Sequence, residues 1–337
     1  MKESKPMIPH TVVPEANISN ATKVVIALGG NALMEAGTPP TAEEQLRVVK
    51  KTCENLANIS CSGFEMARVH GNGPQVGRLV LQQEIAAAAQ PDQLPAIPFD
   101  CCGAMTEGYI GYQIQQSLRD ALRNKNRNVP VVTIVTQVIV DDGDPAFQNP
   151  TKPIGRFYTA KEAKKLAKEK GWTMKEDSGR GWRRVVPSPK PKRIVELDSV
   201  KRLWDSTIVV TAGGGGIPVV ENMDGSLTGV AAVIDKDLAA ERLAEDMETD
   251  ILLILTEVEN VYINFGKPDQ KALEHITVSE AIKYMEEGQF GSGSMEPKVM
   301  AAIKFARRFP GKKAIITSLA KAIDALEGRA GTVITMA

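Results

Sequence analysis

The sequence predicts an α/β fold with a largely parallel, open sheet of about eight strands between two helical layers. Short apolar runs, such as 24–28 and 251–255, are typical of strands buried on both faces of a sheet. Stretches with helical patterning separate these runs, which favours parallel strands joined by crossover helices. Glycine-rich turns follow three of the strands at once. In a parallel sheet such turns meet at one edge.

Length and composition set limits on this fold. The 337 residues suffice for one large α/β unit or two lobes. Charge is balanced, with 41 basic and 41 acidic residues, so the whole chain lacks the signature of a polyanion-binding protein. No apolar run approaches the roughly 18 residues that span a bilayer. Four cysteines without a C-x-x-C pair favour a reducing, cytoplasmic location and no structural zinc.

The N-terminal half repeats a pattern of strand, glycine turn and helix. Residues 1–20 are polar and lack the apolar core of a secretory signal, so we expect a flexible extension, with organelle targeting left open. Thr41 and Glu44 form a capping-box pattern that begins a helix ending near Ile59. The other expected elements are strands at 24–28 and 64–69, helices at 75–89 and 104–122, and a β-branched buried strand at 129–140.

The composition changes at residue 141. Residues 151–202 contain 16 Lys and Arg against 6 Asp and Glu, a net charge of 16 − 6 = +10. We interpret 141–200 as an inserted subdomain that forms a lid over the main sheet. There are two alternatives. The segment could be a solvent-exposed basic loop region without a functional role, or it could bind nucleic acid. One basic insert without a known binding module is weak support for nucleic-acid binding.

The C-terminal half resumes the alternation of strands and helices. Thr277 and Glu280 form a second capping pattern. The expected elements are a strand at 207–211 followed by Gly213–Gly216, a helix at 229–247, a strand at 251–255, a helix ending at Arg308, and closing strands at 314–317 and 332–336.

The three glycine turns predict an anion-binding cleft. They lie at Gly29–Gly30, Gly71–Gly73 and Gly213–Gly216, where backbone N–H groups stay uncovered by any Cβ. Lysines near the turns or in capping segments add charge: Lys152, Lys236 and Lys298. Positioning and charge neutralisation provide most of the catalysis of phosphoryl transfer. The combination therefore predicts an enzyme that handles phosphate.

Missing motifs exclude other chemistry. The sequence has no G-x-x-x-x-G-K-[ST] of P-loop enzymes and no G-x-G-x-x-G opening a first βα unit, which argues against a dinucleotide site. It has no G-x-S-x-G of serine hydrolases. The histidines are His10, His70 and His275, too few and too scattered for a histidine-rich metal site.

At motif level the sequence resembles the carbamate kinases of the amino acid kinase superfamily. The matching segments cover nearly everything after residue 20: ALGGNAL (27–33), HGNGPQVG (70–77), CGAMTEGYIGY (102–112), NPTKPIG (149–155), AGGGGIPV (212–219), IDKDLAAERLA (234–244) and GSMEPKV (293–299). The resemblance implies a three-layer αβα sandwich with a protruding lid. It implies a carbamate or carbamoyl phosphate lobe at 21–206, which includes the lid, and a nucleotide lobe at 207–337.

The resemblance also implies an activity, a phosphotransferase with a carboxyl-group acceptor. The reaction is ATP + carbamate ⇌ ADP + carbamoyl phosphate, used mainly to make ATP in arginine catabolism. Mg²⁺ would be coordinated by the nucleotide phosphates with few protein ligands, so no residue is assigned as a metal ligand. The implied assembly is a homodimer, without nucleic-acid or membrane partners.

Site roles are carried over by matching positions. Lys236 and Lys298 would neutralise the phosphoryl group, Asp237 would hold both lysines, and Lys152 would approach from the lid. Substrate and phosphate would bind at Gly29, Gly30, Asn31, Gly71, Asn72, Gly73, Gly213, Gly214 and Gly215. The nucleotide would contact Asp235, Thr256, Val258, Tyr262, Met295, Pro297 and Lys298.

One position departs from the wider superfamily. Many of its kinases carry a lysine just before the Leu-Gly-Gly turn, where this chain has Ala27. This matches the carbamate kinase subgroup, in which a lid lysine supplies the charge, and disfavours acetylglutamate, aspartate or uridylate kinases. The competing hypotheses are another small-substrate kinase of the same fold and a regulatory module that senses nucleotide or amino acid and has lost catalysis. The intact Lys152, Lys236, Asp237 and Lys298 argue against the second.

Overall fold

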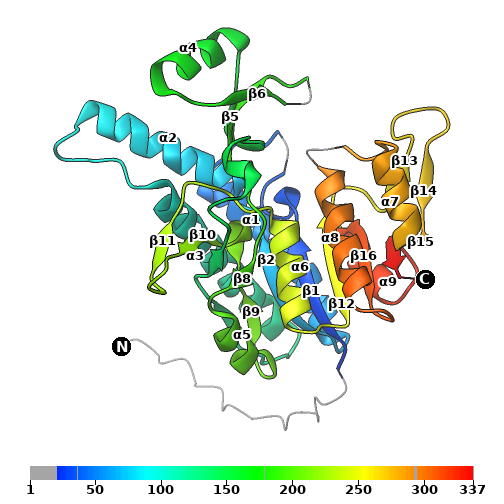
Figure 1. Cartoon of the computed structure of the whole chain (residues 1–337). Helices are drawn as coiled ribbons and strands as arrows, with labels where there is room; N and C mark the ends of the chain where they lie inside the picture. The colour runs from blue at the N-terminus through cyan, green and yellow to red at the C-terminus, as the bar shows by residue number, and fades with distance from the viewer. Residues whose placement is uncertain (1–20, 36, 178, 292–293, 337) are drawn as a thin grey trace, which may run out of the picture.

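An eight-stranded sheet organises the protein, as the computed structural model shows (Figure 1). The structure describes residues 21–35, 37–177, 179–291 and 294–336; the extension expected at 1–20 lies outside these ranges. The strand order is β15-β17-β16-β12-β1-β2-β9-β3, and every pair is parallel except β16 with β17. The bounds are β1 Lys23–Leu28, β2 Glu65–His70, β3 Val131–Thr133, β9 Ile208–Val210, β12 Ile251–Thr256, β15 His275–Thr277, β16 Lys313–Ser318 and β17 Thr332–Thr335.

Helices cover both faces of this sheet, which confirms the predicted three-layer sandwich. Along β1, Val25 and Ala27 pack on one face of the sheet, with the helices between residues 197 and 308, whereas Val24, Ile26 and Leu28 pack on the other face, with the helices at 42–61, 99–124 and 322–326. This alternation buries both faces of the strand, as the continuous apolar run predicts. The helices are α1 Ala42–Cys61, α2 Gly73–Ala89, α3 Phe99–Asn124, α5 Leu197–Trp204, α6 Lys236–Asp246, α7 Val278–Glu286, α8 Met295–Arg308 and α9 Ala322–Leu326.

The lid is a separate three-stranded sheet with one helix, which stands above the body in Figure 1. It comprises β5 Lys152–Tyr158, α4 Ala160–Lys170, β6 Met174–Glu176 and β7 Trp182–Val186. The predicted segment 141–200 contains this unit but extends beyond it. After β7 the chain returns to the body, where β8 Arg193–Ile194 joins another sheet.

Two smaller sheets complete the body. The four-stranded sheet has the order β11-β10-β4-β8, with β4 at Gln137–Ile139, β10 at Ile217–Glu221 and β11 at Leu227–Gly229. The hairpin of β13 Val261–Ile263 and β14 Lys271–Leu273 lies beside α7 in Figure 1. None of the helices within the described ranges has the length and hydropathy that crossing a bilayer requires.

Three predicted elements were wrong in extent. The helix expected at 104–122 already begins at Phe99, directly after Pro98. The strand expected at 129–140 is two strands in different sheets, β3 and β4. Between them the Thr136 N–H donates to Glu107, and the Thr136 hydroxyl bonds to Ile134 and Thr211, so side chains replace a strand partner. The helix expected at 229–247 begins only at Lys236, because the Asp235 side chain caps its N-terminus by accepting from the Asp237 N–H.

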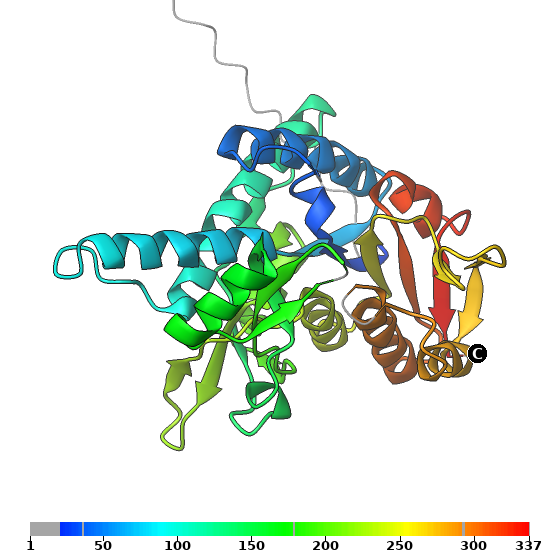
Figure 2. The ribbon, with the colours of Figure 1, turned by 90° about the horizontal axis from the view of Figure 1, so that it is seen from above.

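The lid rests on α2 through a close contact of two backbones, and Figure 2 shows α2 extending alongside the lid. A Cβ on Gly77 of α2 would lie 2.0 Å from the Gly155 nitrogen of β5. Gly155 itself has φ +70°, a conformation that side chains disfavour. Two glycines therefore allow the strand that carries Lys152 to approach the helix.

We expect Gly77→Ala to displace β5, because a Cβ has no space against the Gly155 backbone. The free energy of unfolding should fall by about 1–3 kcal/mol, the usual cost of overpacking. Denaturant titration measures this change. Gly103→Ala on α3 is the control, since a Cβ there meets nothing within 4 Å. Equal stability of the two variants would contradict the close contact.

Candidate active site

The three predicted glycine turns converge at one edge of the main sheet. The first follows β1, the second follows β2, and the third, Gly213–Gly215, follows β9. Because β1, β2 and β9 are neighbouring parallel strands, their C-terminal ends point to the same edge. The Gly71 N–H donates to the Leu28 carbonyl at 3.3 Å, which joins the first two turns.

Glycine is required where these turns come close to neighbouring parts of the chain. A Cβ on Gly29 would lie 2.8 Å from the Leu255 carbonyl oxygen of β12. Gly214 has φ +70°, and a Cβ there would lie 2.2 Å from the side-chain amide nitrogen of Asn72. The second turn therefore packs directly on the third. Asn31 lies within the one-turn helix Gly30–Ala32.

The third turn supports the site more than it lines it. The Gly213 N–H donates to the Glu107 carboxylate at 2.8 Å, and the Gly215 N–H donates to the Ala212 carbonyl at 3.0 Å. Both predicted donors are therefore already engaged. Of the three glycines, Gly214 lines the smaller cavity described below.

Glu107 of α3 links this turn to the start of β4. It is 1% exposed, and its carboxylate accepts from the Thr136 N–H at 3.1 Å as well as from Gly213. Burial raises the pKa of Glu107 to about 8, although both backbone donors favour the ionised form. Glu107 lies within the motif CGAMTEGYIGY (102–112), which could have pointed to it, but the sequence analysis assigned it no role.

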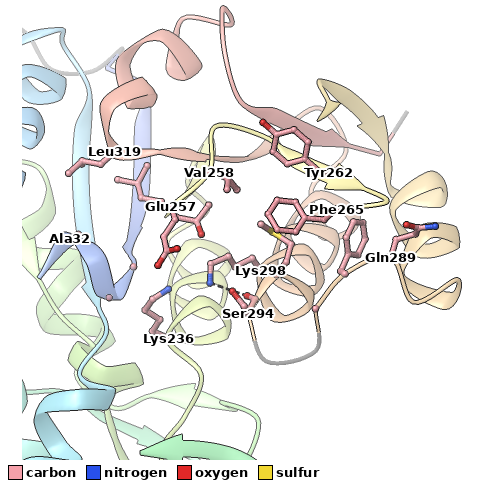
Figure 3. A pocket seen from close by; sticks show the side chains of 17 residues that line it. Ala32, Lys236, Glu257, Val258, Tyr262, Phe265, Gln289, Ser294, Lys298 and Leu319 are labelled. Atoms are coloured by element: carbon pink, nitrogen blue, oxygen red, sulfur yellow. Dashed lines mark hydrogen bonds between the residues drawn. The ribbon is translucent and has the colours of Figure 1, made fainter. Parts of the chain in front are cut away.

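Two lysines share one buried carboxylate. The Lys236 ammonium lies 2.5 Å from one Asp237 oxygen, and the Lys298 ammonium lies 3.1 Å from the other. Asp237 is 1% exposed. Burial lowers the pKa of Lys236 despite its carboxylate partner. Burial also opposes ionisation of Lys298, but the nearby carboxylates, Asp237 above all, together raise its pKa. Figure 3 shows the two side chains meeting beside Ser294, whose carbonyl accepts from Lys298.

Lys152 reaches the same cluster from the lid. Its ammonium lies 2.5 Å from an Asp235 oxygen, while the other oxygen accepts from the Asp237 N–H. Although burial opposes ionisation, Lys152 and Lys236 hold the pKa of Asp235 below its usual range. Asp235, predicted in the nucleotide site, thus lies with Lys152 at the smaller cavity.

Two cavities meet at the lysines. The smaller, about 170 Å³, is lined by the Gly71–Gly73 turn, Gly214, Lys152 and Asp235. The larger, about 500 Å³, lies on the side of β12 and α8. Four residues line both cavities: Gly30, Lys236, Ser294 and Lys298. The shared wall is therefore where a group could pass from one cavity to the other.

The larger cavity contains most of the predicted nucleotide residues. Thr256, Val258, Tyr262 and Met295 line it, whereas Pro297 in the first turn of α8 lines neither cavity. Tyr262 and Phe265 lie across the cavity from the lysines in Figure 3. Sequence reasoning missed several lining residues, which lie in loops or on a hairpin without a motif: Glu257, Phe265, Gln289, Phe290 and Leu319.

His70 lies beneath the second turn and is wholly buried. Its Nδ1 donates to the Gly71 carbonyl at 3.0 Å, and burial lowers its pKa to about 4. A neutral, enclosed imidazole is badly placed to accept a phosphoryl group. Within the described ranges, no group of three or more His, Cys, Asp or Glu side chains could hold a metal ion.

Comparisons with known proteins agree with this geometry. The model of the amino acid kinase family matches residues 22–318. The carbamate kinase of Pyrococcus horikoshii is 54% identical over 93% of this chain and 99% of its own, and that of Clostridium perfringens is 54% identical over 92% and 98%. The structure of Giardia lamblia carbamate kinase bound to AMP-PNP has 45% identity and a TM-score of 0.85, over 94% of this chain and 98% of that one.

These matches cover the glycine turns, the lid and the lysine cluster together, at identities well above those at which only the fold is shared. Lys152, Lys236, Asp237 and Lys298 all lie inside the span that the family model matches. The chain therefore belongs to the amino acid kinase family, where it groups with the carbamate kinases as a phosphotransferase.

Proposed function

We propose that the protein catalyses ATP + carbamate ⇌ ADP + carbamoyl phosphate. The observation that carries the proposal is the junction of two cavities at Lys236 and Lys298. The larger cavity suits a nucleotide, and the smaller suits a small carbonyl substrate beside N–H donors. A γ-phosphoryl group at the junction would contact both ammonium groups while it moves between substrates.

The proposed mechanism is direct in-line transfer without a phosphoenzyme. Lys236 and Lys298 stabilise the negative charge of the phosphoryl oxygens, and Asp237 keeps both ammonium groups in place. The Gly29–Gly30 turn adds backbone donors, and Lys152 closes the substrate side from the lid. Buried, neutral His70 does not serve as an intermediate acceptor.

Mg²⁺ enters this proposal with the nucleotide. Glu257 lines the larger cavity, whereas the carboxylates of the smaller cavity, Asp235 and Asp237, are both paired with lysines. They are therefore poor candidates for a permanent metal site, and a nucleotide-bound Mg²⁺ would supply charge neutralisation on the phosphates.

We also propose that ATP synthesis in arginine catabolism is the main use of the reaction. We propose that the protein acts in the cytoplasm, where its four free cysteines stay reduced.

We further propose that the protein forms a homodimer through α3. Met105 and Tyr112 are seven residues apart on one face of this helix and are 42% and 58% exposed. Val135, 51% exposed, follows β3, which packs on α3 where Gly111 meets Thr133. Several large apolar side chains exposed in one region are typical of a protein interface.

The activity is tested by coupled measurement of ATP formed from ADP and carbamoyl phosphate. We expect turnover well above background with carbamoyl phosphate. We expect none when acetylglutamyl phosphate, aspartyl phosphate or UDP replaces carbamoyl phosphate as the phosphoryl donor to ADP. Folded protein that forms no ATP from carbamoyl phosphate would rule the proposal out. Turnover with one of the other substrates would instead identify a different kinase of the same fold.

Lys298→Ala should lower turnover by at least about 10²-fold, the usual effect of removing one electrostatic contact with a transition state. Because Asp237 keeps Lys236 as a partner, the variant should still fold. Circular dichroism tests whether its secondary structure is retained. Lys283→Ala, which removes a lysine side chain that is 71% exposed, is the matched control and should keep normal turnover. Near-normal turnover of Lys298→Ala would refute its role.

Tyr112→Glu should convert the homodimer into a monomer, because it places a charge in an apolar interface. Sedimentation velocity gives the mass of each species. Met336→Glu, at an apolar side chain that is 42% exposed near the C-terminus, is the control and should remain a dimer. A wild-type protein that sediments as a monomer would contradict the proposed assembly.

A further inference from the structure

A buried glutamine lies in the wall of the smaller cavity. Gln75 is in the first turn of α2, directly after the second glycine turn, and is 3% exposed. Its side-chain nitrogen donates to the Gln45 carbonyl oxygen at 3.2 Å. Its own side-chain oxygen has no hydrogen-bond partner within the described part of the chain. A buried acceptor without a partner costs free energy unless a ligand completes it.

Neighbouring side chains fix which end of Gln75 is free. The Gln45 oxygen accepts from the Tyr109 hydroxyl at 3.3 Å as well as from Gln75, and the Gln45 nitrogen donates to Gln113 at 2.7 Å. Burial raises the pKa of Tyr109, so its hydroxyl keeps the proton that it donates. Because Gln45 presents oxygen, Gln75 must turn its nitrogen toward Gln45. Its carbonyl oxygen is left as the free acceptor.

The rest of the cavity mainly offers donors. Backbone N–H groups of the glycine turns and the three ammonium groups suit the oxygen atoms of a phosphoryl or carboxylate group. Asp235 and Asp237 could accept hydrogen bonds, but lysines already occupy them. The NH₂ group of a carbamate is a donor and needs an acceptor. Acetate has the same shape but carries a methyl group there.

We propose that the side-chain oxygen of Gln75 accepts a hydrogen bond from the substrate NH₂ group and selects carbamoyl phosphate over acyl phosphates that carry a methyl group at that position. This role rests on the proposed function and makes Gln75 a determinant of specificity. The buried chain of Gln113, Gln45 and Tyr109 acts through Gln75 by holding its orientation.

The test compares carbamoyl phosphate with acetyl phosphate as phosphoryl donors to ADP. Gln75→Met removes the acceptor at nearly constant side-chain length. The ratio of kcat/KM for carbamoyl phosphate to that for acetyl phosphate should fall by about tenfold or more, since a site that bonds a substrate NH discriminates strongly against its absence. Turnover of acetyl phosphate should change by less than about threefold.

Gln82→Met is the matched control, because it makes the same change on the same helix, α2, at an exposed position outside the cavity lining. Its substrate ratio should remain that of the wild type. If Gln75→Met does not fold, Gln75→Asn serves instead, since it withdraws the oxygen by one methylene group and should lower the ratio in the same direction. An unchanged ratio, or an equal loss with both substrates, would overturn the inference. Wild-type protein that forms ATP from neither substrate would refute the proposed function itself.

Discussion

The site depends on the sharing of the Asp237 carboxylate by two ammonium groups. An ionised carboxylate that is 1% exposed needs partners, since an unpaired buried charge is costly. Lys236 and Lys298 supply them from opposite sides. The arrangement keeps two lysines in one small volume despite their repulsion. Lys152 and Asp235 add a second ion pair in the smaller cavity, and a phosphoryl group at the junction of the cavities would lie beside the Lys236 and Lys298 ammonium groups.

The main sheet explains why backbone rather than side chains forms the floor of the site. Ala27, directly before the Leu-Gly-Gly turn, is fully buried in the core and brings no charge to the site. The strand therefore contributes shape and N–H donors, and the charge arrives from α6, α8 and the lid. The close approach of Gly29 to β12 and of Gly214 to Asn72 holds the turns against one another.

The lid and the body are coupled through the same charges. Lys152 lies on β5, which packs on α2 through Gly77 and Gly155, and its ammonium is paired with Asp235 at the start of α6. Asp235 also caps α6, the helix whose first two residues are Lys236 and Asp237. The ion pair thus joins the lid to the N-terminus of the helix that carries Lys236 and Asp237.

The sequence alone determined the layers of the fold, the position of the glycine turns and the identity of the charged residues. These follow from local patterns: apolar runs predict buried strands, and Thr277 with Glu280 predicts a helix start that the structure confirms. Only the tertiary structure decided what depends on distant partners. Thr136 leaves one sheet for another because Glu107 and Thr211 bind it. The Gly213 N–H is bound by Glu107 of α3, and Gln75 in the wall of the smaller cavity donates its amide N–H to Gln45 of α1. No periodicity in the chain encodes such contacts, since their partners are brought together only when α1, α2 and α3 pack.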